Sequence, residues 1–205
     1  MGRIKTSKDN RETYLEKATA ILREKLFKPK GYKVPKVALS ISWSTRGNRG
    51  SRRTTIGQCA STGLHAGGIN HITITPALDG STTDGTLRIL GVLVHELVHA
   101  VDNCKSGHGT PFKHCATAVG LTGPMTATGE SDWLKELLKA QVIKPMGLFP
   151  HQKVSIGGKK QTTRNIKVSC DCCGWSFRTS RTNINEIDNT DCLTGCGGEL
   201  TWSTF

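Results

Sequence analysis

The motif His-Glu-Leu-Val-His at residues 95–99 constrains this chain more than any other feature of its sequence. It lies in an apolar segment whose Leu and Val spacing predicts a helix over about 85–103. Residues four apart share one face of a helix, so His95 and His99 can reach the same metal ion while Glu96 lies beside them. The motif therefore predicts a catalytic zinc ion, with Glu96 as the general base that takes a proton from the attacking water.

A third ligand is expected downstream of this motif, because catalytic zinc ions usually have three protein ligands and one open position. His108 is favoured, since it lies in a Gly-His-Gly loop that can fold back toward the helix. His114, in the next predicted helix, and Glu130 are the alternatives. The metzincin spacing is excluded, because it requires a glycine where this chain has Asp102 and a histidine where it has Lys105.

The surrounding pattern predicts an α+β domain over residues 1–142 with a small antiparallel sheet. Short runs rich in Val, Ile and Thr predict strands over 37–43, 54–61 and 68–75. An amphipathic helix is expected over 9–27, and two further helices are expected to begin at the N-cap residues Thr110 and Ser131. In the sequence, the strands precede the helix that carries the motif and two of the helices follow it.

Five of the eight cysteines cluster near the end of the chain. Cys170 and Cys173 form one pair and Cys192 and Cys196 the other, and four thiolates at such spacing hold a structural zinc ion in a zinc ribbon. Cys172 is an alternative ligand in place of Cys170 or Cys173. A reduced cysteine-rich loop or a pair of disulfides is the alternative to a metal site.

Residues 143–163 are rich in Gly, Pro and Lys without periodicity, and we interpret them as a basic linker to a zinc ribbon over 164–205. The chain carries 28 Lys and Arg against 16 Asp and Glu, a formal net charge of +12. Basic and aromatic side chains of the linker and ribbon predict an interface for nucleic acid, particularly single-stranded nucleic acid. The residues of this predicted interface are Lys159, Lys160, Arg164, Lys167, Trp175, Arg178 and Arg181. The alternative is a solvated basic surface with Trp175 and Phe177 packed in the ribbon core.

The first residues of the chain are polar and charged, and no apolar run is long enough to span a membrane. We therefore expect a cytoplasmic, nucleoid-associated or nuclear protein rather than a secreted one, with no membrane partner. In such reducing compartments cysteines remain thiols or bind metals. Outside the C-terminal cluster, Cys59, Cys104 and Cys115 are scattered along the chain.

The segment HELVHAVDNCKSGHGTPFKH, residues 95–114, resembles the SprT-like metalloprotease domain that also occurs in Spartan. In that family HExxH is followed by a third histidine in a GHG-type loop before a phenylalanine. The resemblance implies that His95, His99 and His108 hold the zinc ion, that Glu96 is catalytic and that Phe112 is the downstream aromatic residue. It extends over about residues 10–140 and implies a zincin-like fold, commonly followed by a zinc ribbon.

The resemblance also implies a zinc-dependent endopeptidase that acts on proteins bound or crosslinked to DNA. The expected cofactors are one catalytic and one structural zinc ion. Two other classes compete with this expectation: a nucleic-acid-binding regulatory zinc protein with little or no peptidase activity, and a peptidase with no nucleic-acid role. The intact Glu96 argues against the first class, and the basic linker would be unexplained under the second.

Overall fold

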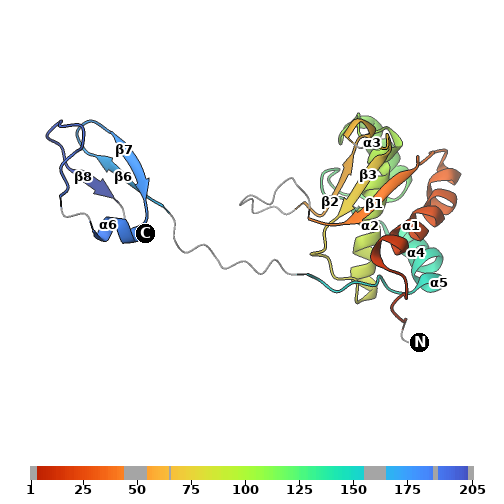
Figure 1. Ribbon diagram of the computed structural model, residues 1–205. Helices are drawn as coiled ribbons and strands as arrows, with labels where there is room; N and C mark the ends of the chain where they lie inside the picture. Colours follow the sequence, from red (N-terminus) through yellow and green to blue (C-terminus); the bar gives the residue numbers. More distant parts are fainter. Residues whose placement is uncertain (1–3, 44–54, 65, 155–164, 187–188, 203–205) are drawn as a thin grey trace. The chain divides into compact units, whose positions relative to one another are not determined.

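The computed structural model describes residues 4–43, 55–64, 66–154, 165–186 and 189–202. Within them the fold combines helices with small sheets, which is the α+β class expected from the sequence (Figure 1). The chain divides into two compact units, Met1–Ile156 and Gly157–Phe205. Among the described residues, no helix combines the length and apolar character that crossing a membrane requires.

A three-stranded sheet lies in the first unit. Its strands are β1 (Val37–Ile41), β2 (Gly57–Ala60) and β3 (Asn70–Ile74), each within a predicted run. The central strand β3 pairs in parallel with β1 and antiparallel with β2, so the sheet is mixed. The prediction of an antiparallel sheet is wrong for β1, because β3 inserts beside β1 after the chain has reversed direction twice. Ile72 and Ile74 of β3 are fully buried, as their alternation predicts.

Four of the five α-helices described in the first unit begin close to the residues that the sequence indicates, whereas the fifth lies in the segment interpreted as a linker. They are α1 (Arg11–Leu22), α2 (Thr83–Val101), α3 (Thr110–Ala118), α4 (Asp132–Leu138) and α5 (Lys144–Met146). Ser131 caps α4 as predicted, since its side chain accepts a hydrogen bond from the Leu134 backbone N–H. Gly109 caps α3 instead of the predicted Thr110, because Thr110 already has helical geometry as the first residue of the helix.

Helix α2 runs through the middle of the first unit and carries the HELVH motif (Figure 1). The Thr82 side chain caps its start by accepting a hydrogen bond from the Gly85 backbone N–H at 3.0 Å. Leu90, Leu93 and Leu97 are fully buried. The helix contacts β2 and β3 on the sheet and also α1, α3 and α4. The motif is therefore fixed on a helix that packs against the sheet and against three other helices.

Residues 144–151, which we call the strap, belong to the first unit although the sequence places them in the linker. Phe149 is buried, and its ring meets the Tyr14 ring edge-on at a centroid distance of 5.2 Å. Leu148 is also buried and forms a parallel β-bridge with Thr6. Aperiodic sequence does not exclude such packing, because two apolar side chains are sufficient to bury a short segment. The first unit thus extends beyond residue 142.

The second unit is a three-stranded antiparallel sheet with one short helix. Its elements are β6 (Ile166–Cys170), β7 (Ser176–Thr179), α6 (Arg181–Asn185) and β8 (Leu200–Trp202), with β6 in the centre of the sheet. Val168, Ile184 and Leu200 form a small buried core together with two cysteines. A core this small gives little stability by itself, so a metal site would be an important part of the fold.

Candidate metal centres

Three histidines of the first unit converge on one point. His95 and His99 project from α2, and His108 comes from the Gly-His-Gly loop that precedes α3. The Nε2 atom of His108 lies 3.2 Å from Nε2 of His99 and 3.3 Å from Nε2 of His95. Zinc–nitrogen bonds of about 2.05 Å in a tetrahedral site place two ligand nitrogens about 3.3 Å apart. The three imidazoles therefore fit the ligand spacing of a zinc ion.

The two alternative third ligands lie elsewhere in the structure. His114 is on the exposed face of α3. Glu130 is the last residue of a short hairpin formed by β4 (Leu121–Thr122) and β5 (Gly129–Glu130), and its carboxylate lies 4.0 Å from Arg88. Neither belongs to the group of His95, His99 and His108, whose ligand atoms all lie within 4.8 Å of one another.

Two neighbouring side chains orient these imidazoles. The Nδ1 atom of His95 lies 2.8 Å from the Thr128 hydroxyl, so an Nδ1–H that donates to this oxygen leaves Nε2 available as a ligand. Phe112 is 2 % exposed, and its ring centroid lies 5.0, 4.4 and 5.0 Å from the rings of His95, His99 and His108 respectively. Phe112 is thus the common packing surface for all three histidines.

Burial keeps the imidazoles neutral. Burial is the largest cause and neighbouring imidazoles add to it, and together they lower the pKa of His95 to about 3 and that of His99 to about 4. Burial also lowers the pKa of His108. Because a metal ion binds only the neutral imidazole, these shifts favour ligand binding near neutral pH.

The carboxyl group of Glu96 is buried beside the three histidines. Glu96 is only 5 % exposed, and burial raises its pKa to about 8, although the backbone N–H of Cys59 donates a hydrogen bond that opposes this shift. The close approach of β2 leaves no room for a side chain at Gly57, where a Cβ atom would lie 2.5 Å from Oε1 of Glu96. Strand β2 therefore both contacts and confines the carboxylate.

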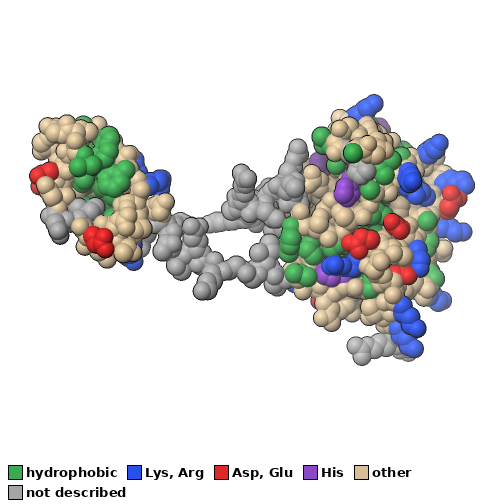
Figure 2. Space-filling model, viewed as in Figure 1, with side chains coloured by type: hydrophobic (Ala, Val, Ile, Leu, Met, Phe, Trp, Pro, Cys, Tyr) green, Lys and Arg blue, Asp and Glu red, His purple; other side chains and the backbone are tan. Residues whose placement is uncertain are grey.

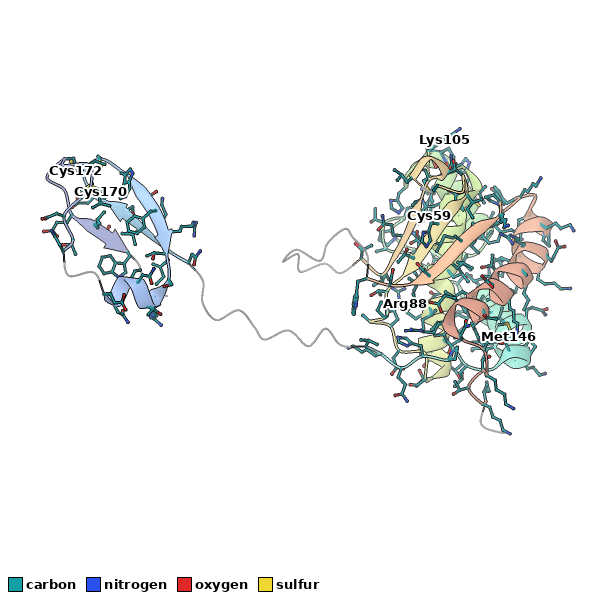
Figure 3. All side chains as sticks on the ribbon, in the orientation of Figure 1. Cys59, Arg88, Lys105, Met146, Cys170 and Cys172 are labelled. Carbon is teal, nitrogen blue, oxygen red and sulfur yellow. The ribbon has the colours of Figure 1, made fainter. Side chains whose placement is uncertain are left out.

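A cavity of about 920 Å³ opens over these groups. It is lined by residues of α2 from Arg88 to His99, including His95 and Glu96, and by residues 55–59 and 126–128. Figure 3 labels Arg88 and Cys59, which both line this cavity. A cavity of this size is within the range of substrate sites in proteins, and here it gives access to the proposed metal ligands and to Glu96.

Four cysteines of the second unit form another convergent group. Cys170 and Cys173 lie around the turn after β6, and Cys192 and Cys196 lie on the turn before β8. The sulfur of Cys170 lies 3.5 Å from that of Cys196, and the sulfur of Cys173 lies 3.7 Å from that of Cys192. Bonds of about 2.3 Å in a tetrahedral zinc–thiolate site separate two sulfurs by about 3.8 Å, so the spacing fits.

The surroundings of these cysteines shift the pKa values of individual thiols in different directions, and that of Cys170 is raised to about 12 although two backbone N–H groups oppose this shift. The backbone N–H groups of Cys172 and Cys173 point to the Cys170 sulfur, at 3.4 and 3.5 Å. Bonds from Gly198 and Thr194 lower the pKa of Cys196 to about 6. Cys172 is exposed and lies outside the group of four, so the structure groups Cys170 and Cys173 with the second pair. Figure 3 shows Cys170 and Cys172 side by side at the turn after β6.

The predicted nucleic-acid interface is described only in part, since Lys159, Lys160 and Arg164 lie outside the described residues. Lys167 on β6 and Arg178 on β7 are exposed and are paired in the sheet register, and Arg181 is exposed on α6.

Trp175 is 37 % exposed, and the centroid of its ring lies 5.4 Å from that of the Phe177 ring. Phe177 packs partly into the small core, whereas Trp175 presents an accessible ring. Figure 2 shows hydrophobic side chains gathered on one face of this unit.

Comparison with protein-family models, with curated proteins and with solved structures finds no significant match to this chain. Function is therefore inferred from the geometry of the two centres. Sequence reasoning missed Thr128 and Gly57, which contact His95 and Glu96 from distant parts of the chain. Linear spacing carries no signal for such contacts, because the partners are brought together only by the tertiary fold.

Proposed function

We propose that this chain is a zinc-dependent endopeptidase with a zincin-like catalytic unit. The observation that carries the proposal is the buried Glu96 carboxyl beside three imidazoles with zinc-ligand spacing, all on the wall of one open cavity. A purely structural zinc site would be closed and would not need a buried acid beside it. The resemblance to SprT-like metalloproteases supports the same assignment.

His95, His99 and His108 would hold the catalytic zinc ion through their Nε2 atoms. A zinc ion supplies Lewis acidity at such a site, which acidifies water and polarises a peptide carbonyl. Glu96 accepts the proton of the attacking water and delivers it to the leaving amine nitrogen. Burial makes its carboxylate a stronger base than an exposed one, and the backbone N–H of Cys59 keeps it oriented.

Strand β2 supports a polypeptide substrate. It forms an edge of the described sheet, and residues 55–59 line the cavity beside Glu96. An extended peptide can bind along such an edge as an additional strand, because backbone hydrogen bonds do not depend on its sequence. This arrangement favours cleavage of unfolded or extended segments.

The substitution Glu96→Gln tests the proposal. It keeps the size of the side chain but removes the proton acceptor, so we expect cleavage of an unfolded protein substrate to fall by about 10²-fold or more. Zinc content, measured by elemental analysis, should stay at the parent value. Glu136→Gln, the same change on the exposed part of α4, is the matched control and should cleave like the parent.

Two results would contradict the assignment. Equal cleavage by the Glu96→Gln variant and the parent would remove Glu96 from the reaction. A zinc-loaded parent chain that cleaves no protein, with or without DNA, but binds DNA would instead support the regulatory zinc protein.

We further propose that the second unit binds single-stranded DNA and brings DNA-associated proteins to the peptidase. The accessible Trp175 ring, with exposed Lys167, Arg178 and Arg181 in the same unit, supports stacking on bases together with phosphate contacts. A structural zinc ion on Cys170, Cys173, Cys192 and Cys196 would hold this unit together.

The variant Trp175→Ala tests this interface without changing the net charge. Loss of one base stack should weaken single-strand affinity by about 5- to 100-fold, measured by fluorescence anisotropy at fixed salt. Trp133→Ala removes a comparably exposed tryptophan from the first unit and should bind like the parent. If a zinc-loaded Trp175→Ala variant keeps full affinity, this ring has no role in DNA binding.

A further inference from the structure

Two thiols that the proposed reaction does not use lie against each other at one end of the cavity. Cys59 is on β2, and Cys104 follows the end of α2. Their sulfur atoms are 3.3 Å apart. A disulfide bond is about 2.04 Å long, so a relative shift of about 1.3 Å would allow the bond to form.

The backbone around Cys104 holds its thiol in this position. Asn103 and Cys104 have φ angles of 59° and 60°, a left-handed conformation that is rare for two successive residues other than glycine. The Asn103 side chain accepts hydrogen bonds from the Thr62 backbone N–H at 2.8 Å and from the Asn70 amide at 2.9 Å. Asn70 is itself 1 % exposed. A buried polar network therefore maintains a strained turn that places the two sulfurs in contact.

The same two thiols are accessible to small molecules. Both residues are half-buried, and both line the cavity that contains His99 and Glu96. Neither belongs to the two groups of residues that could hold a metal ion among the described residues. The other cysteine of the first unit, Cys115, is buried in the core and outside this cavity.

We propose that Cys59 and Cys104 form a reversible disulfide on exposure to a peroxide, and that this disulfide is a redox modification site of the peptidase. One thiolate attacks the peroxide and becomes a sulfenic acid as water is released. The second thiol then attacks that sulfur and releases a second water. Two thiols and one hydrogen peroxide thus give one disulfide and two waters, and a thiol reductant reverses the change.

The disulfide alters the catalytic site through β2. The backbone N–H of Cys59 contacts Glu96, and the backbone N–H of Cys104 donates to the carbonyl oxygen of His99 at 2.8 Å. The histidine nitrogens already have the spacing of a zinc site when the sulfurs are apart. Drawing the two sulfurs together displaces one or both backbone segments, so oxidation lowers peptidase activity. This last step rests on the proposed function.

Peptide mapping of the full zinc-loaded chain tests disulfide formation directly. The chain is treated with hydrogen peroxide, its remaining thiols are blocked with N-ethylmaleimide, and it is digested without reductant. We expect mass spectrometry to find the peptide of Cys59 linked to that of Cys104, and the link to disappear after reduction. Recovery of both residues as blocked thiols, or as separately oxidised sulfinic acids, would overturn the proposal.

Activity measurements test the consequence for the site. Oxidation should lower peptide cleavage by about tenfold or more, since misplacing catalytic groups by about 1 Å can cost about 10²-fold. Cys104→Ser should lose this sensitivity, and the exposed Cys172→Ser, which keeps the pair, should retain it. Full activity of the disulfide-linked chain would overturn the regulatory role. If the reduced chain cleaves nothing, the proposed function fails while the mapping result still decides whether the disulfide forms.

Discussion

His95 is contacted at both nitrogens of its ring. Its Nε2 faces the other two histidines, while its Nδ1 meets the Thr128 hydroxyl at 2.8 Å. A metal ion at Nε2 requires the proton on Nδ1, and the Thr128 hydroxyl is placed to accept a hydrogen bond from that N–H. Thr128 thus orients one of the proposed ligands through the ring nitrogen that does not face the other histidines.

Replacing Thr128 with Val should weaken zinc binding at the proposed site of His95, His99 and His108. The substitution keeps the shape of the side chain but removes the acceptor for the His95 N–H, and loss of such a partner typically costs about 10- to 100-fold in metal affinity. Competition with a chromogenic chelator measures this affinity.

Thr128→Ser is the matched control, because serine keeps the hydroxyl group on the same carbon atom as threonine. It should recover most of the zinc affinity. Equal affinity of the Val variant and the parent would mean that His95 needs no partner at Nδ1.

Elements β2 and α2 approach each other unusually closely at the site. A Cβ atom at Gly57 would lie 2.5 Å from Oε1 of Glu96 and 2.6 Å from a methyl carbon of Val92. Real Cβ atoms do not make contacts this short, so the absence of a side chain is what allows the strand to confine the carboxylate.

We expect Gly57→Ala to impair cleavage while zinc remains bound. The added methyl group pushes Glu96 or β2 away, and displacement of a catalytic group by about 1 Å can lower the rate by about 10²-fold. Gly63→Ala is the control, since no atom lies within 4 Å of the corresponding Cβ position. Steady-state cleavage and zinc content are measured for both, and normal cleavage by Gly57→Ala would contradict the assigned role of this contact.

The elements themselves could be predicted where local spacing determines them. The Leu and Val spacing before His95 predicted α2, Ser131 was identified as an N-cap, and alternation predicted the buried face of β3. The grouping of His95 and His99 also follows from helix geometry. These features depend on residues a few positions apart, whose relative placement is determined by the repeat of a helix or a strand.

Other features depend on contacts that sequence spacing does not encode. Parallel pairing of β1 with β3, the Thr128 contact and burial of Phe149 each join distant segments. Cys59 and Cys104 were scattered cysteines in the sequence, yet their sulfurs are in contact. Only the packed fold brings these residues together, so one sequence without its structure could not indicate them.

At the scale of the whole molecule, the two centres lie in separate compact units. We expect the purified chain to bind two zinc ions. Joint replacement of His95 and His99 by Ala should remove one ion, and joint replacement of Cys192 and Cys196 by Ser should remove the other. Elemental analysis measures both losses.

The consequences for folding should differ between the two changes. Loss of the cysteine site should unfold the second unit, since its apolar core is small and metal binding supplies folding free energy. The helical circular dichroism signal, which comes mainly from the first unit, should persist. Loss of both zinc ions from either double variant would show that the sites depend on each other.

The strap holds the first described residues of the chain in place. Leu148 bridges Thr6, and its backbone N–H and carbonyl oxygen bond to Lys5 and Ser7 (Figure 1). The chain then continues across the unit, where the backbone N–H of Val154 donates to the carbonyl oxygen of Pro76. A truncation of residues 1–7 would therefore remove both backbone partners of Leu148 and uncover its side chain, so residues 5–7 contribute to the stability of the proposed catalytic unit.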